Sequence, residues 1–419
     1  MSTPEAPPPP AQPAEPTTFA ARVSKKQRAG GIIVPIVTVL FALLMSWIVV
    51  AATQHSAHKA WTVFEEIFYG TGLNWFVHLS TDVSPTGSVS AYNISQTLLL
   101  STPIILTGLA VAFAFRCGMF NIGGNGQYLV GLLVANWLGV KFPGLNPFLH
   151  ILLCMVAGTL AAAAYAGIAG VLKATVGAHE VISTIMLNWI AFWVASWLIG
   201  VGGPLQTSDP AQATYPVSNQ ISPGARLPDF WGQQGLQGVH VGLFIALAAV
   251  VVFWILLSRT TLGYEVRAVG FNPDAAAYGG INVKKNYIRA MAISGGFAGL
   301  AGALDMLGGA QNYQIGQLDI PFISVGFIGI AAALLGRNTA IGTLLGALLF
   351  GALSYGSFHG LGHSSVIDPT LANNLPYIIQ GLIVLFIGAD VLILSVWNSR
   401  KKLKPKRQAP STPAAEVAS

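Results

Sequence analysis

The feature that most constrains this chain is the spacing of its charged side chains. Asp, Glu, Lys and Arg make up 9% of the 419 residues, against roughly 25% in a typical soluble domain. Long windows contain none of them, for example those from Arg28 to Lys59 and from Asp82 to Arg116. A helix needs about 20 mostly apolar residues to cross a bilayer, and these windows allow that. A soluble fold could not cover its surface with so little charge.

The charge-free windows predict an all-α, polytopic membrane protein with about ten transmembrane helices. The predicted spans are 31–52, 93–115, 117–140, 148–172, 181–200, 240–258, 288–308, 320–336, 339–357 and 376–397. Lys and Arg gather on the cytoplasmic side of membrane proteins. Basic residues precede the first span and follow the last, at 25–28 and 400–407. Both ends are therefore expected inside, which agrees with an even number of spans.

The two ends of the chain also explain its net charge of +6. Residues 1–28 form a Pro/Ala-rich segment predicted to be a disordered cytoplasmic tail, and 400–419 form a basic cytoplasmic tail. The transmembrane domain covers 29–399, with a cytoplasmic loop at 259–287. Because the excess of Lys and Arg lies in the tails, it indicates topology, and no nucleic-acid partner is expected.

No catalytic motif is present in the sequence. There is no GxxxxGK[ST] loop for ATP and no GxSxG nucleophile motif. His179-Glu180 lacks the second His of a zinc protease, and the His and Cys residues have no metal-ligand spacing. We therefore expect a protein that is not an enzyme, with no metal and no cofactor, and transport or scaffolding is the favoured class.

A Gly/Asn-rich stretch at 120–127 interrupts the apolar background. A span beginning only at Gly126 would reach about 22 Å, too short for a core of about 30 Å. The span should therefore include a helix break near Asn121, Asn125 and Gln127. Irregular backbone at membrane depth lines a cavity or is buried in protein, so these residues are candidates for a substrate pathway. An ordinary cytoplasmic turn is an equal alternative.

Further polar residues lie near the ends of predicted spans. Asp305 is an acid inside an apolar span, and Gln311 and Asn312 follow it. Intramembrane carboxylates are costly and often functional. Asn188 is an amide among apolar neighbours, whereas Trp189 and the tryptophans that follow it at four-residue spacing are typical of a lipid-facing stripe. The predicted substrate pathway thus comprises Asn121, Asn125, Gln127, Asn188, Asp305, Gln311 and Asn312.

Small residues recur through the span that precedes Asp305. Gly295, Gly299 and Ala303 are spaced by four residues, and Gly302 lies beside them. This small-xxx-small pattern is typical of close helix packing in membranes. We expect an architectural role for all four.

The predicted cytoplasmic loop at 259–287, which we call the inside loop, carries the sequence signals of a capped helix. Asn272 suits an N-cap, Pro273 the first helical position and Asp274 the positive end of the helix dipole. A second short helix is expected around 264–269. A capped helix on the cytoplasmic side is a docking device, although a plain connector is the alternative.

Three stretches of the chain resemble the permease subunits of ABC importers for branched-chain amino acids, simple sugars and nucleosides, with the nucleoside type most similar. They are 109–127 (LAVAFAFRCGMFNIGGNGQ), 261–281 (TLGYEVRAVGFNPDAAAYGGI) and 297–304 with 332–338 (FAGLAGAL and AALLGRN). Together they run through roughly residues 95–395. The family pattern tends to have Glu at Asn125 and near Asp305, so the identity of the substrate is not implied.

The resemblance implies partners and a location. ATP-binding cassette ATPase subunits would bind the inside loop, a second permease, of a different sequence, would complete the pathway, and an extracytoplasmic binding protein would deliver substrate. The segment implied to couple to the ATPase contains Glu265, Arg267, Gly270, Asn272, Pro273 and Asp274. The expected function is ATP-driven import of nucleosides or simple sugars across the cytoplasmic membrane of a prokaryote. An ion-coupled secondary transporter of a small polar solute is the alternative.

Overall fold

The computed structural model of the chain describes residues 33–76, 89–209, 215–230, 238–309, 312–320, 324–362 and 374–387. Within these ranges the protein is built of helices, with isolated β-bridges between loops. The helices before the inside loop are α2 (Ile33–Thr53), α3 (Ala57–Gly70), η1 (Leu73–Phe76), α4 (Val89–Arg116), α5 (Gly124–Lys141), α6 (Pro147–Val176), α7 (Glu180–Ile199), η2 (Pro223–Ala225) and α8 (Gly242–Arg259). After it come α9 (Thr261–Phe271), α10 (Pro273–Tyr278), α11 (Val283–Leu307), α12 (Val325–Leu335), α13 (Ala340–Gly362) and the helix Asn374–Ile387.

The all-α, polytopic class is confirmed. A helix lies in each of the ten predicted windows, and seven of the described helices are long and apolar enough to cross a membrane, namely α2, α4, α6, α7, α8, α11 and α13. α12 and the helix Asn374–Ile387 are apolar but shorter. The ten crossings and the inside position of both ends stay predictions. The two tails and residues 388–397 of the last predicted span lie outside the described residues.

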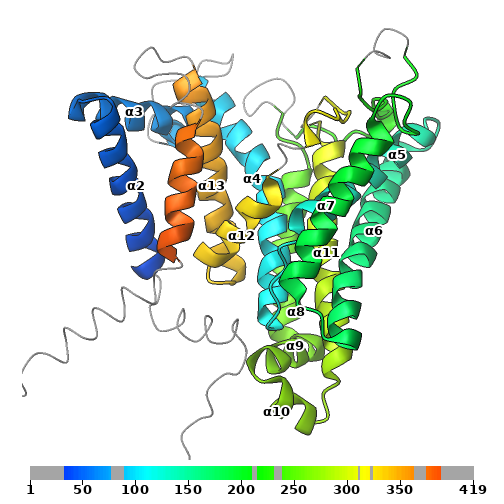
Figure 1. Ribbon diagram of the computed structural model, residues 1–419. Helices are drawn as coiled ribbons and strands as arrows, with labels where there is room; N and C mark the ends of the chain where they lie inside the picture. The colour runs from blue at the N-terminus through cyan, green and yellow to red at the C-terminus, as the bar shows by residue number, and fades with distance from the viewer. Residues whose placement is uncertain are drawn as a thin grey trace, which may run out of the picture.

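α4 is the central helix of the bundle and is buried along most of its length. In Figure 1, α2, α3, α13 and the orange-red helix Asn374–Ile387 lie on one side of it, and α5, α6, α7 and α11 lie on the other. α9 and α10 lie at the lower end of the bundle, opposite α3. The two ends of the bundle therefore carry different short helices.

α11 packs against α5 and α6 through its small residues. A Cβ on Gly302 would lie 2.0 Å from the carbonyl oxygen of Tyr128, and one on Gly299 would lie 2.2 Å from the Cβ of Ala162. Ala303 is fully buried, and Gly295 meets α6 in the same way as Gly299. A larger side chain at these positions would push the helices apart.

Three elements differ from the sequence prediction. α5 begins at Gly124 and not at residue 117, because Cys117, Gly118 and Met119 direct their N–H groups to the last turn of α4. The irregular stretch 117–123 thus precedes α5, and the helix itself is not split. α12 has 11 residues, fewer than the 17 predicted. The short helix expected at 264–269 is longer, because α9 already begins at Thr261. The side chain of Thr260 caps it there by accepting a hydrogen bond from the N–H of Gly263.

α3 is an element that the sequence prediction missed. It lies inside the segment between the first two predicted spans. Ala60, Val63 and Ile67 are buried on one face, and Trp61 on the opposite face is 66% exposed. Figure 1 shows the helix running across the end of the bundle, as an amphipathic helix at a membrane interface does.

Candidate functional site

The fold leaves open a cavity of about 800 Å³ beside α4. Its lining comes from α4, α5, α11, α12, α13, the helix Asn374–Ile387 and the loops at 217 and 312–319. The contributing residues of α4, α11 and α13 lie in the halves of these helices that are remote from α9 and α10. Ligand pockets span roughly 300–1,000 Å³, so the cavity can enclose a small solute.

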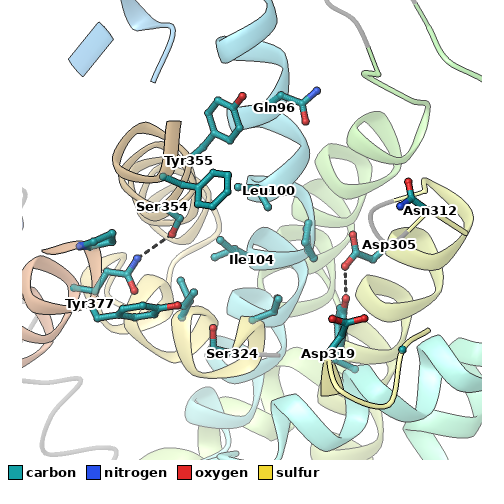
Figure 2. Close-up of a pocket in the computed structure, with 18 of the residues that line it drawn as sticks. Gln96, Leu100, Ile104, Asp305, Asn312, Asp319, Ser324, Ser354, Tyr355 and Tyr377 are labelled. Atoms are coloured by element: carbon teal, nitrogen blue, oxygen red, sulfur yellow. Dashed lines mark hydrogen bonds between the residues drawn. The ribbon is translucent and has the colours of Figure 1, made fainter. Parts of the chain in front are cut away.

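One side of the cavity carries carboxylates. Asp305 extends from the last turns of α11, and the hydroxyl of Tyr128 on α5 donates a hydrogen bond to its Oδ2. Asp319 and Asn312 lie on the loop that follows, and both are exposed. Figure 2 shows Asp305, Asp319 and Asn312 on the same side of the opening. Tyr128 orients the carboxylate of Asp305, so its position does not depend on a bound ligand.

The opposite side of the cavity carries aromatic rings. Tyr355 and Phe358 come from α13, and Tyr377 comes from the helix Asn374–Ile387. The Tyr355 ring stacks on His359, with ring centroids 5.5 Å apart. Ser354 accepts a hydrogen bond of 2.9 Å from Nε2 of Gln380, which joins the two helices. Leu100 and Ile104 of α4 lie between the two sides (Figure 2).

The structure separates the predicted pathway residues into two groups. Asp305 and Asn312 line the cavity. Asn121, Gln127 and Asn188 form a second group at the start of α5, which we call the amide cluster, and they do not line it. Asn125 lies between the two groups, and Gln311 lies outside the described residues. Trp189 and the two tryptophans that follow it on α7 are exposed.

The amide cluster satisfies the backbone of the stretch 117–123. Asn121 is fully buried; its Nδ2 donates to Gln127 Oε1 and to Ser294 Oγ, each at 2.8 Å. Its Oδ1 accepts from the N–H of Gly123 at 2.9 Å. Asn188 accepts from the N–H of Gly126 and donates to the carbonyl of Ile122, both at 2.8 Å. Buried backbone groups need such partners where no helix provides them.

Asn125 connects this cluster to the cavity. Its Oδ1 accepts a hydrogen bond of 2.6 Å from the N–H of Gly326, in the first turn of α12. The neighbouring residues Ser324 and Val325 line the cavity. Asn125 therefore fixes the start of a helix that forms part of the cavity wall.

The inside loop has the capping geometry that its sequence predicts. The Asn272 side chain accepts hydrogen bonds from the N–H groups of Asp274 at 3.0 Å and Ala275 at 3.2 Å. Pro273 is the first residue of α10. Tyr278, at the end of this helix, is 95% exposed. α10 thus presents a capped, exposed surface at the lower end of the bundle in Figure 1.

The preceding helix α9 is packed against the bundle. A Cβ on Gly270 would lie 2.1 Å from the carbonyl oxygen of Arg116, at the end of α4. Glu265 accepts a hydrogen bond of 3.0 Å from Asn286 and lies 3.8 Å from Arg289. The Nε of Arg267 donates to the carbonyl of Gly263 at 3.1 Å. α9 is therefore attached to both α4 and α11.

Arg116 extends these contacts to the turn between α12 and α13. Its Nε and Nη2 both donate to the carbonyl oxygen of Asn338, at 2.9 and 2.7 Å. Arg337 and Asn338 have φ angles of 55° and 53°, a left-handed conformation that orients this carbonyl. α12 and α13 both line the cavity, so a continuous set of contacts joins α9 to it.

Sequence reasoning missed Tyr128, Asp319, Tyr355, Tyr377 and Arg116. A tyrosine at the end of an apolar span is common at membrane interfaces, which hides a cavity-lining role. Asp319 lies in a polar loop, where a charge needs no explanation. Arg116 follows a long apolar run and would be expected to face the cytoplasmic solvent.

Comparison with known proteins finds relatives that are described as permease components or permease proteins. Residues 93–388 match the family described as branched-chain amino acid transport system / permease component. The guanosine ABC transporter permease protein NupP of Bacillus subtilis is 33% identical over 384 residues, covering 90% of this chain and 98% of NupP. The glucose ABC transporter permease protein TsgB13 of Haloferax volcanii is 31% identical over 360 residues (84% and 86%). The guanosine ABC transporter permease protein NupQ of Bacillus subtilis is 30% identical over 264 residues (62% and 79%). No solved structure matches the chain.

Proposed function

Because the chain belongs to the family of branched-chain amino acid transport system permease components, we propose that it is the transmembrane subunit of an ATP-driven importer. It carries nucleosides or simple sugars inward across the cytoplasmic membrane of a prokaryote. The cavity beside α4 carries this proposal, because it combines carboxylates, amides and aromatic rings within about 800 Å³. Such a lining suits a polar, uncharged solute with a flat face.

The inside loop is the proposed docking site for the ATPase subunits. α10 is capped and exposed, and Tyr278 with Phe271 and Tyr264 adds accessible aromatic surface there. Aromatic residues are enriched at protein interfaces. ATP hydrolysis belongs to those partner chains. Since NupP and NupQ are two guanosine permease proteins of one organism, the second permease of this importer is proposed to be a different polypeptide. An extracytoplasmic binding protein delivers the substrate.

The contacts from α9 to the cavity suggest how ATPase movement reaches the substrate. Movement of α9 would displace Arg116 through Gly270, and Arg116 would displace the α12–α13 turn through Asn338. The packing of α12 and α13 seen here and a second, shifted packing would then correspond to the two openings of the pathway, outward and inward. Arg116→Lys, which cannot donate two hydrogen bonds in this geometry, should leave ATPase association unchanged and lower transport per ATP hydrolysed severalfold.

The decisive test is nucleoside and sugar uptake by the complete importer, with and without a substitution of the Walker lysine in its ATPase. Uptake that stops in the ATPase variant supports the proposal. Uptake that persists and follows a proton or sodium gradient would support an ion-coupled secondary transporter instead.

A second test addresses the docking site. Tyr278→Ala should reduce co-purification of the ATPase, because it removes the most exposed aromatic ring of α10. Trp189→Ala is the matched control, since Trp189 is a 56% exposed aromatic residue in the middle of α7 and does not belong to the inside loop. If both variants retain the ATPase at wild-type yield, the docking assignment is wrong.

A further inference from the structure

We infer that the cavity binds a ribonucleoside in one orientation, with the ribose against Asp305 and Asp319 and the base against Tyr355, Phe358 and Tyr377. We call these two sets the acidic wall and the aromatic wall. The inference rests on the proposed import function and deepens it, because it assigns the residues that select the substrate. The observation that carries it is the separation of two chemistries on opposite sides of one cavity (Figure 2).

The acidic wall presents hydrogen-bond acceptors at fixed positions. Tyr128 donates to Oδ2 of Asp305. Asp319 closes a turn in which its N–H donates to the carbonyl of Gly316 at 3.1 Å, which orders the backbone at its carboxylate. Neighbouring hydroxyl groups are donors that carboxylates accept in charge-assisted hydrogen bonds. The ribose of a nucleoside carries such a pair, as its 2′ and 3′ hydroxyls.

The aromatic wall presents ring faces and few charged groups. Phe358 and Tyr377 are 74% and 63% exposed, although each lines the cavity and not an outer loop. Tyr355 is held by its stack on His359. Nucleobases stack on aromatic side chains, and this stacking tolerates different bases because each has a π face. The wall therefore suits several bases without selecting one.

The charge of the residues that line the cavity restricts the chemical class of the ligand further. Among the described residues around the cavity there is no Lys or Arg, and both ionisable acids are on one wall. A phosphate ester placed at the ribose end would meet carboxylates with no cation to compensate. A free sugar would leave the aromatic wall without a base, and a free base would leave the acidic wall without hydroxyls. An unphosphorylated ribonucleoside satisfies both walls.

The test is a double-mutant cycle in which one protein side chain and one hydroxyl of the ligand are each removed, alone and together. The measured quantity is nucleoside uptake by the complete importer in proteoliposomes. Asp319→Asn should lower uptake of guanosine about tenfold, the usual effect of losing a charge-assisted hydrogen bond. The same substitution should change uptake of 3′-deoxyguanosine or 2′-deoxyguanosine by less than about twofold. Because the binding protein is the same in every arm, its own preference cancels from the cycle. Asp229→Asn, an exposed acid outside the cavity, is the control.

The aromatic wall is tested in the same system. Tyr377→Ala should lower uptake of ribo- and deoxynucleosides equally, by about tenfold, and Tyr377→Phe should restore it, because the ring and not the hydroxyl carries the stacking. The inference is overturned if Asp319→Asn lowers the uptake of all these nucleosides equally, or if Tyr377→Ala leaves uptake unchanged. ATP-dependent uptake of simple sugars but of no nucleoside would also overturn the inference. Uptake of neither class of solute would instead contradict the proposed function.

Discussion

Two groups of polar side chains in this protein differ in what their polar atoms face. In the amide cluster, Asn121, Gln127 and Asn188 direct their side-chain atoms to one another and to backbone groups. Around the cavity, Asp319 is exposed, and Asp305 lines the open space while its Oδ2 accepts a hydrogen bond from Tyr128. The comparison teaches that a polar residue in an apolar chain can support the backbone or line a cavity, and that its hydrogen-bond partners distinguish the two.

The largest expected effect comes from breaking the amide cluster. Asn121→Leu removes the partners of the Gly123 N–H and of the Gln127 amide, and leaves both buried without replacement. Each unsatisfied buried group costs roughly 1–3 kcal/mol, so the free energy of unfolding should fall by about 4 kcal/mol. Denaturation in detergent measures this change. The preference among nucleosides of any remaining transport should not change; a shifted preference would place Asn121 in the substrate path.

A pH-dependent effect is expected at His240, which is buried in the loop before α8 and belongs to neither of the two groups. Burial lowers the pKa of His240 from 6.5 to about 4, against the opposing effect of Asp229. The unfolded chain therefore takes up a proton first as the pH falls. The stability of the fold is complete above about pH 6.5 and decreases by about 3 kcal/mol as the pH drops to about 4.

The measurement is the free energy of unfolding of the wild type and of His240→Gln at pH 7 and pH 4.5. The difference between the two pH values should be smaller in the variant, because Gln does not titrate. Equal differences would show that His240 does not contribute to the acid sensitivity.

A matched pair of serines sharpens the comparison further. Ser294 accepts from Asn121 and donates to the Ala110 carbonyl at 2.6 Å, and it is fully buried. Ser354 makes its hydrogen bond to Gln380 at the cavity wall and is half-buried. Ser294→Ala should lower the free energy of unfolding by about 2 kcal/mol and Ser354→Ala by about 0.5 kcal/mol, because water can replace only the second hydroxyl. Similar losses from the two substitutions would contradict the distinction.

A small stability effect with a clear functional readout is expected at Tyr128. Tyr128→Phe removes the donor to Asp305, and Asp305 can then bind water from the cavity. The free energy of unfolding should fall by about 1 kcal/mol. The Michaelis constant for nucleoside uptake should rise severalfold, because the carboxylate is no longer oriented. An unchanged constant would show that this orientation does not matter for the substrate.

The sequence predicts the secondary structure of this protein better than its site. The charge-free windows locate a helix at every predicted span, and the cap at Asn272 is visible because its residues are adjacent in the chain. α3 was missed because Lys59, Glu65 and Glu66 obscure the spacing of its buried face.

The site was only partly predictable, because its residues meet from distant parts of the chain. Asp305 stands out as a carboxylate in an apolar span and does line the cavity. Asn121 stands out equally, yet its partners are Gln127 and Ser294. Which of the two contacts a cavity depends on how α5, α11 and α13 pack, and a pattern along a single helix does not contain that information.

The irregular stretch before α5 has a consequence for biogenesis. Its backbone groups pair with Thr184, Asn188 and, through Asn121, Ser294. These residues are synthesised up to about 170 positions later, which takes on the order of ten to thirty seconds at ribosomal rates. During this interval the stretch between α4 and α5 lacks those partners, and its backbone groups need water or other polar groups in their place. The final packing of α5 therefore waits for α7 and α11, and it depends on helices that do not yet exist when α5 leaves the ribosome.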